Sequence, residues 1–547
     1  MTADHPTPPP ADDPAAPPAD HPAAPPADPL TSAPLTDLPV APEYAEPVVD
    51  WHRLDVRMLV VRPLNEIVNL VPVFLGLLLL GRGETWRILA SVGVIVAIVV
   101  FGLLRWVTTR YRITADQVEL HTGLFVRKRL AVPRDRIRTV DLTAKLGHRL
   151  FGLSAIRVGT GQRDQPGEDG LTLDAVSSAE AERLRVLLLT RTTTTAAPEP
   201  KAAEGTVLST WDTRWLRYAP LTLSGLVAVG ALFGLVVNYA RELDVEVLGP
   251  MTDLAHWVVE QPIWLTVSVF TGAVLLIAGL GSVLVYVVQF WGYRLTREPD
   301  DTVRVQRGLL TTRSVSVAEQ RLRGVEIEEP LLLRAGRGAH AKTVTTGLGR
   351  KGESNLLLPP APITEAHRVS ALVLHQPTSP TQATLRRHPI AALRRRVIRA
   401  ITPVLVLTAV VAYLAPSWTW LPIALLPVSA LLAWDRYRSL GHALTDRYLL
   451  ARQGSVIRET VALQRTGIIG WRISRSFFQR RSGLVTISAT TAAGDGAYHV
   501  VDVAEADGLA VADEAVPGLL RPFLEAPSEV RSEVRSGGAE GGAVGAG

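Results

Sequence analysis

The sequence predicts an α+β membrane protein with six transmembrane helices in three pairs, each pair followed by a cytoplasmic β-sandwich or barrel with a C-terminal helix. Three observations lead to this fold class. The apolar runs occur in pairs, arginines flank the outer ends of each pair, and the polar segments after the pairs resemble one another. Hydrophobic residues make up 47% and charged residues 20% of the 547 positions, which is low charge for a soluble protein.

Both ends of the chain have the composition of disordered segments. Residues 1–50 are rich in Pro, Ala and Asp and contain no Lys or Arg, so they cannot bury enough apolar surface to offset chain entropy. This acidic arm also lacks the basic start and apolar run of a signal peptide. Residues 527–547 are predicted to form a disordered tail, and the Thr- and Ala-rich stretch 191–212 is predicted to be a linker.

Three pairs of apolar runs, within 60–107, 215–291 and 397–435, are predicted to cross the membrane. About 20 helical residues span a hydrocarbon core of ~30 Å. The third pair is short and contains prolines, so a re-entrant hairpin or a buried helix pair remains open as an alternative there. The six runs are Leu64–Leu80, Trp86–Val107, Ala219–Ala240, Ile263–Phe290, Val397–Leu414 and Trp418–Trp434.

The charges around these runs predict their orientation. Arginines lie before and after each pair, as Arg53, Arg57 and Arg62 do before the first, whereas the turn 241–262 inside the second pair is mainly acidic. Because basic loops remain in the cytoplasm, both termini and all three polar segments are expected on the cytoplasmic side of the plasma membrane.

The polar segments 108–190, 292–376 and 440–522 are predicted to be repeats of one domain. They open with YRIT, YRLT and HALT, beginning at Tyr111, Tyr293 and His442, and reach a glycine turn 12 to 15 residues later. A basic or polar strand follows, and a β-like run then leads into a short amphipathic helix. Alternating β-branched strands closed by one helix predict a small sandwich or open barrel. The glycines of the turns are Gly123, Gly308 and Gly454.

These motifs resemble the bacterial pleckstrin-homology (PH)-like domain of YdbS/YdbT-type membrane proteins. Repeat two lacks the Q-R-x-x-G-L segment of that family, and Thr139 stands where the family has a central Gln, so one ligand common to all copies is not implied. The resemblance implies a seven-stranded β-sandwich capped by a C-terminal helix, no enzyme activity, and a smaller membrane protein with a related domain as partner. The matching positions are Tyr111, Thr114, Gly123, Pro133, Arg136, Ile137, Val140, Arg149, Gly152 and Leu153 in repeat one, Tyr293, Thr296, Gly308, Arg321, Leu322 and Val325 in repeat two, and Thr445, Gly454, Gln464, Arg465, Gln479, Arg480, Gly483 and Leu484 in repeat three.

Motifs for catalysis are missing from the sequence. There is no cysteine, no phosphate loop, no H-E-x-x-H and no G-x-S-x-G. We therefore expect no catalytic residues, no metal ligands and no cofactor, and the net charge of +5 is too balanced to predict nucleic-acid binding. Basic residues on the domains fit either solvated strands near a membrane or contact with anionic lipid. The residues proposed to contact lipid or a partner are Arg134, Arg136, Arg321, Gln464, Arg465 and Arg480.

The sequence favours an integral membrane scaffold whose three cytoplasmic domains bind protein partners or anionic lipid headgroups, in envelope maintenance or stress resistance. A component of a membrane transporter or exporter is the alternative. In that case Glu66 and Asn69, the notable polar pair in a span, would be functional. Enzyme activity is the third and weakest hypothesis.

Overall fold

The computed structural model describes residues 51–61, 102–123 without Arg105 and Ala115, 128–159, 171–189, 205–222, 262–346 and 355–520, with scattered positions in between. The arm 1–50, the tail 527–547, Leu64–Leu80 with Glu66 and Asn69, and most of Trp86–Val107 and Ala219–Ala240 lie outside the described residues.

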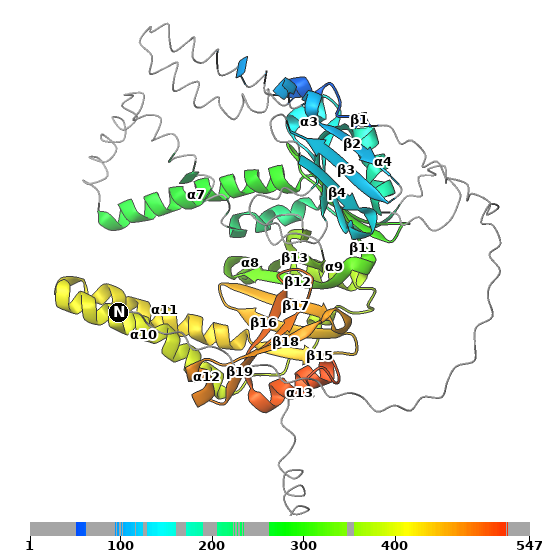
Figure 1. Cartoon of the computed structure of the whole chain (residues 1–547). Helices are drawn as coiled ribbons and strands as arrows, with labels where there is room; N and C mark the ends of the chain where they lie inside the picture. The colour runs from blue at the N-terminus through cyan, green and yellow to red at the C-terminus, as the bar shows by residue number, and fades with distance from the viewer. Residues whose placement is uncertain are drawn as a thin grey trace, which may run out of the picture. The chain divides into compact units, whose positions relative to one another are not determined.

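The first repeat consists of two antiparallel sheets and a terminal helix (Figure 1). One sheet contains β1 (His52–Arg53), β2 (Arg110–Ile113), β3 (Gln117–Thr122) and β4 (Lys128–Pro133). After the 3-10 turn η1 (Arg134–Arg136), the second sheet contains β5 (Thr139–Ala144), β6 (Leu153–Gly159) and β7 (Thr172–Ser177), with the short helix α3 (Leu146–Leu150) between β5 and β6 and the terminal helix α4 (Ser178–Leu189).

The second repeat follows the same order. Its strands are β8 (Thr206–Thr210), β9 (Arg294–Glu298), β10 (Thr302–Arg307) and β11 (Thr312–Ala318), then η4 (Glu319–Arg321), β12 (Leu322–Pro330), β13 (Gly338–Thr345) and β14 (Leu356–Pro362). The short helix α8 (Leu331–Ala335) lies between β12 and β13, and α9 (Ile363–Val373) is the terminal helix.

The third repeat has six strands among its described residues. They are β15 (Gly441–Leu444), β16 (Tyr448–Gly454) and β17 (Ile457–Gln464), then η8 (Arg465–Gly467), β18 (Gly470–Ser474), β19 (Leu484–Thr490) and β20 (Ala497–Ala504). The short helix α12 (Phe477–Arg481) lies between β18 and β19, and α13 (Glu505–Ala515) is the terminal helix.

The first strand of each sandwich precedes its apolar pair in the sequence. β1 pairs with β2, and β8 pairs with β9, although an apolar pair separates the two strands in each case. In repeat three the corresponding contact is a single bridge between Arg386 and His442. In repeats one and two the apolar pair is therefore inserted between the first and second strands of a sandwich, and in repeat three the bridge at Arg386 stands where the first strand would be. The stretch 191–212, predicted as a linker, contains β8, since Thr206–Thr210 pairs antiparallel with β9, and its Thr and Val residues favour a strand.

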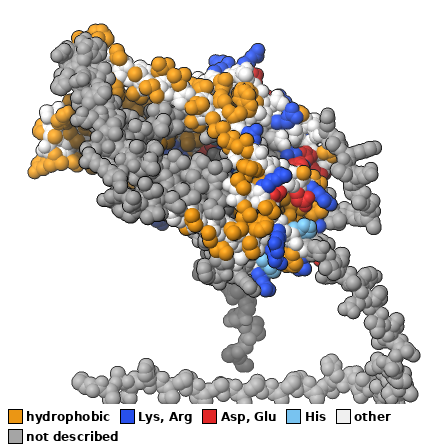
Figure 2. Space-filling view, turned by 90° about the horizontal axis from the view of Figure 1, so that it is seen from above, with side chains coloured by type: hydrophobic (Ala, Val, Ile, Leu, Met, Phe, Trp, Pro, Cys, Tyr) orange, Lys and Arg blue, Asp and Glu red, His pale blue; other side chains and the backbone are white. Residues whose placement is uncertain are grey.

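Three helices in the described part of the chain are long and apolar enough to cross a membrane. They are α7 (Ile263–Phe290), α10 (Ile390–Leu414) and α11 (Trp420–Arg438), and α10 and α11 form a hairpin (Figure 1). Pro403 and Pro427 lie inside α10 and α11 without ending either helix. Among the described residues visible in Figure 2, hydrophobic side chains gather on one side of the view, and most arginine, aspartate and glutamate side chains lie on the other. The length and apolar composition of these helices indicate that the chain is a membrane protein.

The three glycine turns have a steric cause. Gly123, Gly308 and Gly454 have φ values of 118°, 110° and 96°, a region that other residues rarely enter. A Cβ at Gly454 would lie 1.8 Å from the carbonyl oxygen of Ile457. The glycines predicted from the sequence are thus required by the turn between the second and third strands after each apolar pair.

Adjacent repeats share continuous sheets. β11 of repeat two pairs antiparallel with β5 of repeat one, and β17 of repeat three pairs antiparallel with β12 of repeat two. The result is one seven-stranded and one six-stranded sheet, each built from two repeats. Backbone hydrogen bonds therefore join the repeats in sequence order.

Candidate membrane-facing site

Each repeat carries a short helix with exposed apolar side chains and arginine. In α3, Leu146 and Leu150 are 53% and 74% exposed, and α8 exposes Leu331 and Leu332. The strongest case is α12, in which Phe477 and Phe478 are each 68% exposed. The arginines on these helices are Arg149 on α3, Arg334 on α8, and Arg480 and Arg481 on α12.

Local sequence explains why these helices are so short. In α12, the Ser476 hydroxyl accepts a hydrogen bond from the Gln479 amide, and the Gln479 side chain accepts one from the Ser476 amide, which forms a capping box. Residues with positive φ end the turns: Gly152 at 67°, Gly483 at 63° and Arg337 at 57°. Repeat two therefore keeps this turn, although its sequence lacks the Gly-Leu motif of the other two.

Each short helix is connected to the domain end of a long apolar helix. Arg149 of α3 donates a hydrogen bond to the carbonyl of Leu309, whose amide in turn donates to Val288 of α7 over 2.9 Å. Arg334 of α8 forms an ion pair of 2.8 Å with Asp435 of α11. In α12, the connection runs through a buried carboxylate.

That carboxylate is Asp502 on β20, which is fully buried and has a φ of 60°. It accepts hydrogen bonds from Arg395 (2.5 Å) and Arg396 (3.0 Å) of α10. It also accepts one from the Nε2 atom of Gln479 on α12, over 2.9 Å. The start of an apolar helix, a core strand and the short helix of repeat three are thus held by one carboxylate.

A basic cavity of about 670 Å³ lies at the domain end of α11. Its lining includes Arg387, Arg438 and Arg452, and none of the described residues that line it is a carboxylate. Trp434 and Tyr437 of α11 also line it. Arginine forks recognise phosphate oxygens, and Trp and Tyr are enriched where a helix leaves the hydrocarbon. The cavity therefore has the chemistry to hold an anionic headgroup.

The predicted site residues do not form one site. Arg465 donates hydrogen bonds to the carbonyls of Ala515 (2.8 Å) and Asp446 (3.1 Å), so it secures the end of α13. Arg134 plays the matching role in repeat one, where it donates to the Leu187 carbonyl of α4.

The remaining predicted residues divide into two groups. Arg321 donates a 3.4 Å hydrogen bond to the Asp135 carbonyl of repeat one, and Gln464 lies opposite Tyr448 in the sheet. Arg136 and Arg480 are exposed. Among these residues, Arg480 lies on one of the short helices with exposed apolar side chains. Sequence reasoning missed the exposed Phe477 and Phe478, although an aromatic pair followed by two arginines was a usable signal.

One group of three carboxylates in the described residues is close enough to hold a cation: Glu326, Glu328 and Glu459. Burial, and then the charges of Glu328 and Glu459, raise the pKa of Glu326 to about 8. Burial would raise the pKa of Glu328, but hydrogen bonds from His340 and Lys342 outweigh it and lower that pKa to about 2. A proton on Glu326 and the charge on Lys342 thus relieve the repulsion within this cluster.

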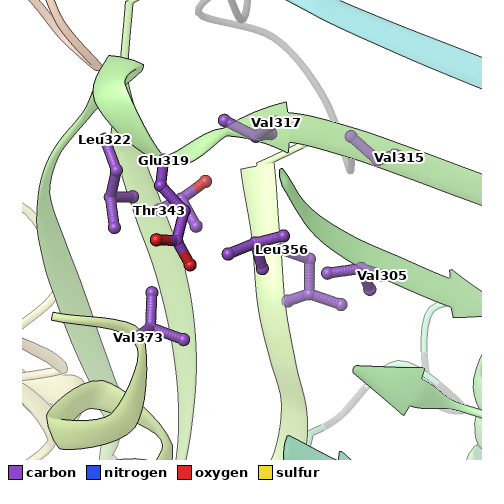
Figure 3. Close-up of a pocket in the computed structure, with 9 residues that line it drawn as sticks. Val305, Val315, Val317, Glu319, Leu322, Thr343, Leu356 and Val373 are labelled. Carbon is purple, nitrogen blue, oxygen red and sulfur yellow. The ribbon is translucent and has the colours of Figure 1, made fainter. Parts of the chain in front are cut away.

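The interior of the second sandwich is nearly filled. Figure 3 shows valine and leucine side chains from both sheets around a cavity of about 10 Å³, with the Glu319 carboxylate among them. That volume is about one water-sized probe, and Glu319 is paired with Arg297. This cavity is therefore too small for a ligand larger than water.

Comparison with known proteins identifies the family. A family model described as bacterial PH domain matches residues 66–192, 247–376 and 396–512, more than half of the chain. UPF0699 transmembrane protein YdbT of Bacillus subtilis (strain 168) is 22% identical over 433 residues, which cover 76% of this chain and 84% of that protein. No solved structure shows a significant match. The chain is a membrane-associated protein that belongs to the bacterial PH domain family and contains three copies of the domain.

Proposed function

We propose that the protein is a multi-pass scaffold of the plasma membrane, with both termini in the cytoplasm and three PH-like domains that contact anionic lipid headgroups and protein partners. The observation that carries this proposal is the set of short helices α3, α8 and α12, each with exposed apolar side chains and arginine beside the end of a long apolar helix. This combination suits the membrane interface, where apolar groups enter the lipid and arginines meet phosphates.

α12 is the strongest contact in this proposal. Phe477 and Phe478 are aromatic and exposed, and Arg480 and Arg481 follow them on the same short helix. Each arginine near an anionic leaflet contributes about 1 kcal/mol. Because α10 already tethers this domain, such weak contacts are sufficient at a high effective concentration.

The basic cavity beside α11 is the proposed headgroup pocket. Arg387, Arg438 and Arg452 would hold the phosphate, while Trp434 and Tyr437 border the acyl region. A free phosphate ion offers the same chemistry, so the lipid has to be distinguished by experiment.

The test uses cysteine labelling, since the chain has no cysteine. Phe478→Cys, labelled with an environment-sensitive fluorophore in the full-length protein, is placed in nanodiscs of phosphatidylcholine with or without phosphatidylglycerol. We expect a blue-shifted label that brominated lipid quenches, and a larger effect with the anionic lipid. Arg183→Cys on α4, whose side chain is 79% exposed, is the matched control and should remain unquenched. A label at 478 that behaves like the label at 183 would refute the membrane contact.

The pocket is tested by lipid retention. Native mass spectrometry of the full-length protein should show anionic lipid lost from the Arg387→Ala, Arg438→Ala double variant and retained in Arg183→Ala. Displacement of the bound mass by millimolar inorganic phosphate would identify a free-ion site instead of a lipid site. Equal retention in both variants would contradict the pocket assignment.

A protein partner is the second part of the proposal. The candidate is a smaller membrane protein with a related PH-like domain, and its support is that PH-like repeats bind one another within this chain. Affinity purification from native membranes in mild detergent, followed by mass spectrometry, would test it. A stoichiometric partner supports the scaffold, and repeated purification without one would contradict this part.

A further inference from the structure

The two junctions between repeats use the same strand pairing. Val317 of β11 faces Thr139 of β5, and Leu463 of β17 faces Gly324 of β12. Val317 and Leu463 both lie two residues before a 3-10 turn, and Thr139 and Gly324 both lie three residues after one. The register of the two junctions is therefore identical with respect to the domain fold.

Among the described residues, this pattern leaves one strand of each kind at the end of a sheet. β4 corresponds to β11 and β17 but has β3 as its single neighbour, and β18 corresponds to β5 and β12 but has β19 as its single neighbour. The first repeat thus presents the edge that joins a preceding repeat, and the third repeat presents the edge that joins a following one.

Both edges expose positions that are buried at the internal junctions. Leu130 of β4 is 37% exposed, whereas the corresponding Val315 and Val461 are 5% and 6% exposed. Ile473 of β18 is also 37% exposed, whereas its counterpart Ile327 of β12 is 1% exposed. An exposed edge strand with apolar side chains is a template for pairing with another strand.

We propose that β4 of one copy of this protein pairs antiparallel with β18 of a second copy, in the register of the internal junctions. Ala131 then faces Trp471, Leu130 faces Arg472 and Arg129 faces Ile473. No two basic side chains lie directly opposite each other in these three pairs, so the repulsion that like charges would cause across strands is avoided.

A second copy is the occupant that the observations favour. The same chain offers both strand types, and each free edge is continuous with the kind of junction that the chain already uses twice. A short strand pair is weak alone, but copies held in one membrane meet at high effective concentration. Since the contact joins two different edges, it is head-to-tail and can add further copies. This inference goes beyond the lipid contacts and does not depend on them.

Cysteine cross-linking tests the register. Two full-length variants with different tags, Leu130→Cys and Arg472→Cys, are co-expressed and their membranes are mildly oxidised. A disulfide requires Cβ atoms about 3.5–4.5 Å apart, and directly opposite residues come near this distance. We expect a disulfide that links the two tagged chains. Leu130→Cys with Ser474→Cys, two residues out of register, is the matched control and should link at least about fivefold less, because diagonal neighbours are ~7–8 Å apart.

Charge substitution provides a second measurement that does not rely on oxidation. Leu130→Arg places like charges opposite each other, so co-purification of differently tagged copies should fall by about threefold or more. Adding Arg472→Glu to the Leu130→Arg chain should restore co-purification, which a folding defect would not allow. Register-independent or absent cross-links, failure of the rescue, or a different protein bound in place of the second copy would overturn the proposal.

Discussion

Asp502 is predicted to control the coupling between α10 and the third PH-like domain. Its side chain is fully buried and accepts hydrogen bonds from Arg395, Arg396 and Gln479. Asp502→Asn removes the charge but retains the side-chain shape, and asparagine tolerates the φ of 60° at this position. The substitution therefore isolates the electrostatic contribution from backbone strain.

The magnitude follows from the burial of the pair. Arg396 is 8% exposed, so loss of the carboxylate leaves a guanidinium in a site with little access to water. Removing one partner of a buried ion pair costs about 3–5 kcal/mol. At about 1.4 kcal/mol per factor of ten, local opening of β20 and α12 should become about 10²- to 4 × 10³-fold more frequent.

Hydrogen exchange of the full-length protein in nanodiscs measures this opening, with mass spectrometry of peptides from 477–481 and 497–504. Glu505→Gln is the matched control, because Glu505 pairs with Arg475 in the same domain but both side chains are exposed, at 40% and 38%. A surface pair contributes about 0–1 kcal/mol, so exchange should rise less than about fivefold. Equal effects of Asp502→Asn and Glu505→Gln would refute the claim that burial of Asp502 couples helix and domain.

Three further substitutions test separate features. Glu326→Gln should make the protein more stable than wild type at alkaline pH. The folded pKa of Glu326 is about 8, above the ordinary value of 4.5, so the wild-type domain loses stability as the pH rises from 4.5 toward 8. The free energy of unfolding of the variant should therefore exceed that of wild type by about 1–3 kcal/mol at pH 9, with little difference at pH 5. Gly454→Ala should destabilise repeat three by about 1–3 kcal/mol in thermal unfolding, because φ is 96° and the new Cβ meets the Ile457 carbonyl. Arg465→Ala should leave carbonyls at the end of α13 without a partner and speed exchange there by about tenfold.

Local and repeated features were predictable from the sequence. The glycine turns at Gly123, Gly308 and Gly454 and the terminal helices depend on residues close together in the chain, so their patterns are visible without a structure. The family resemblance is confirmed by the three matched segments and by the YdbT relative. The described residues include three of the six expected spans, in α7, α10 and α11.

Features that join distant parts of the chain were not predictable. β8 pairs with β9 across an apolar pair, and its five residues carry no signal that distinguishes an edge strand from a linker. Arg134 was proposed for an external contact as a basic residue of repeat one, and Arg465 as a position of the family motif. The structure adds an internal contact for each, a hydrogen bond to a carbonyl of a terminal helix, and the external contact stays a prediction. A single sequence shows the charge of an arginine but not the carbonyl that it meets.

The insertion of an apolar pair between the first and second strands of a sandwich has a mechanical consequence. β8 and β9, which flank the second pair in the sequence, are neighbours in one sheet, so we expect a tilt of that pair to strain both strands. Since the β5–β11 and β12–β17 pairs continue the sheets between repeats, we expect such strain to reach the neighbouring repeat. Loop connections alone would let the domains move independently. We expect the shared sheets instead to couple the three domains, so that the proposed binding of a lipid or protein at one of them would affect the others.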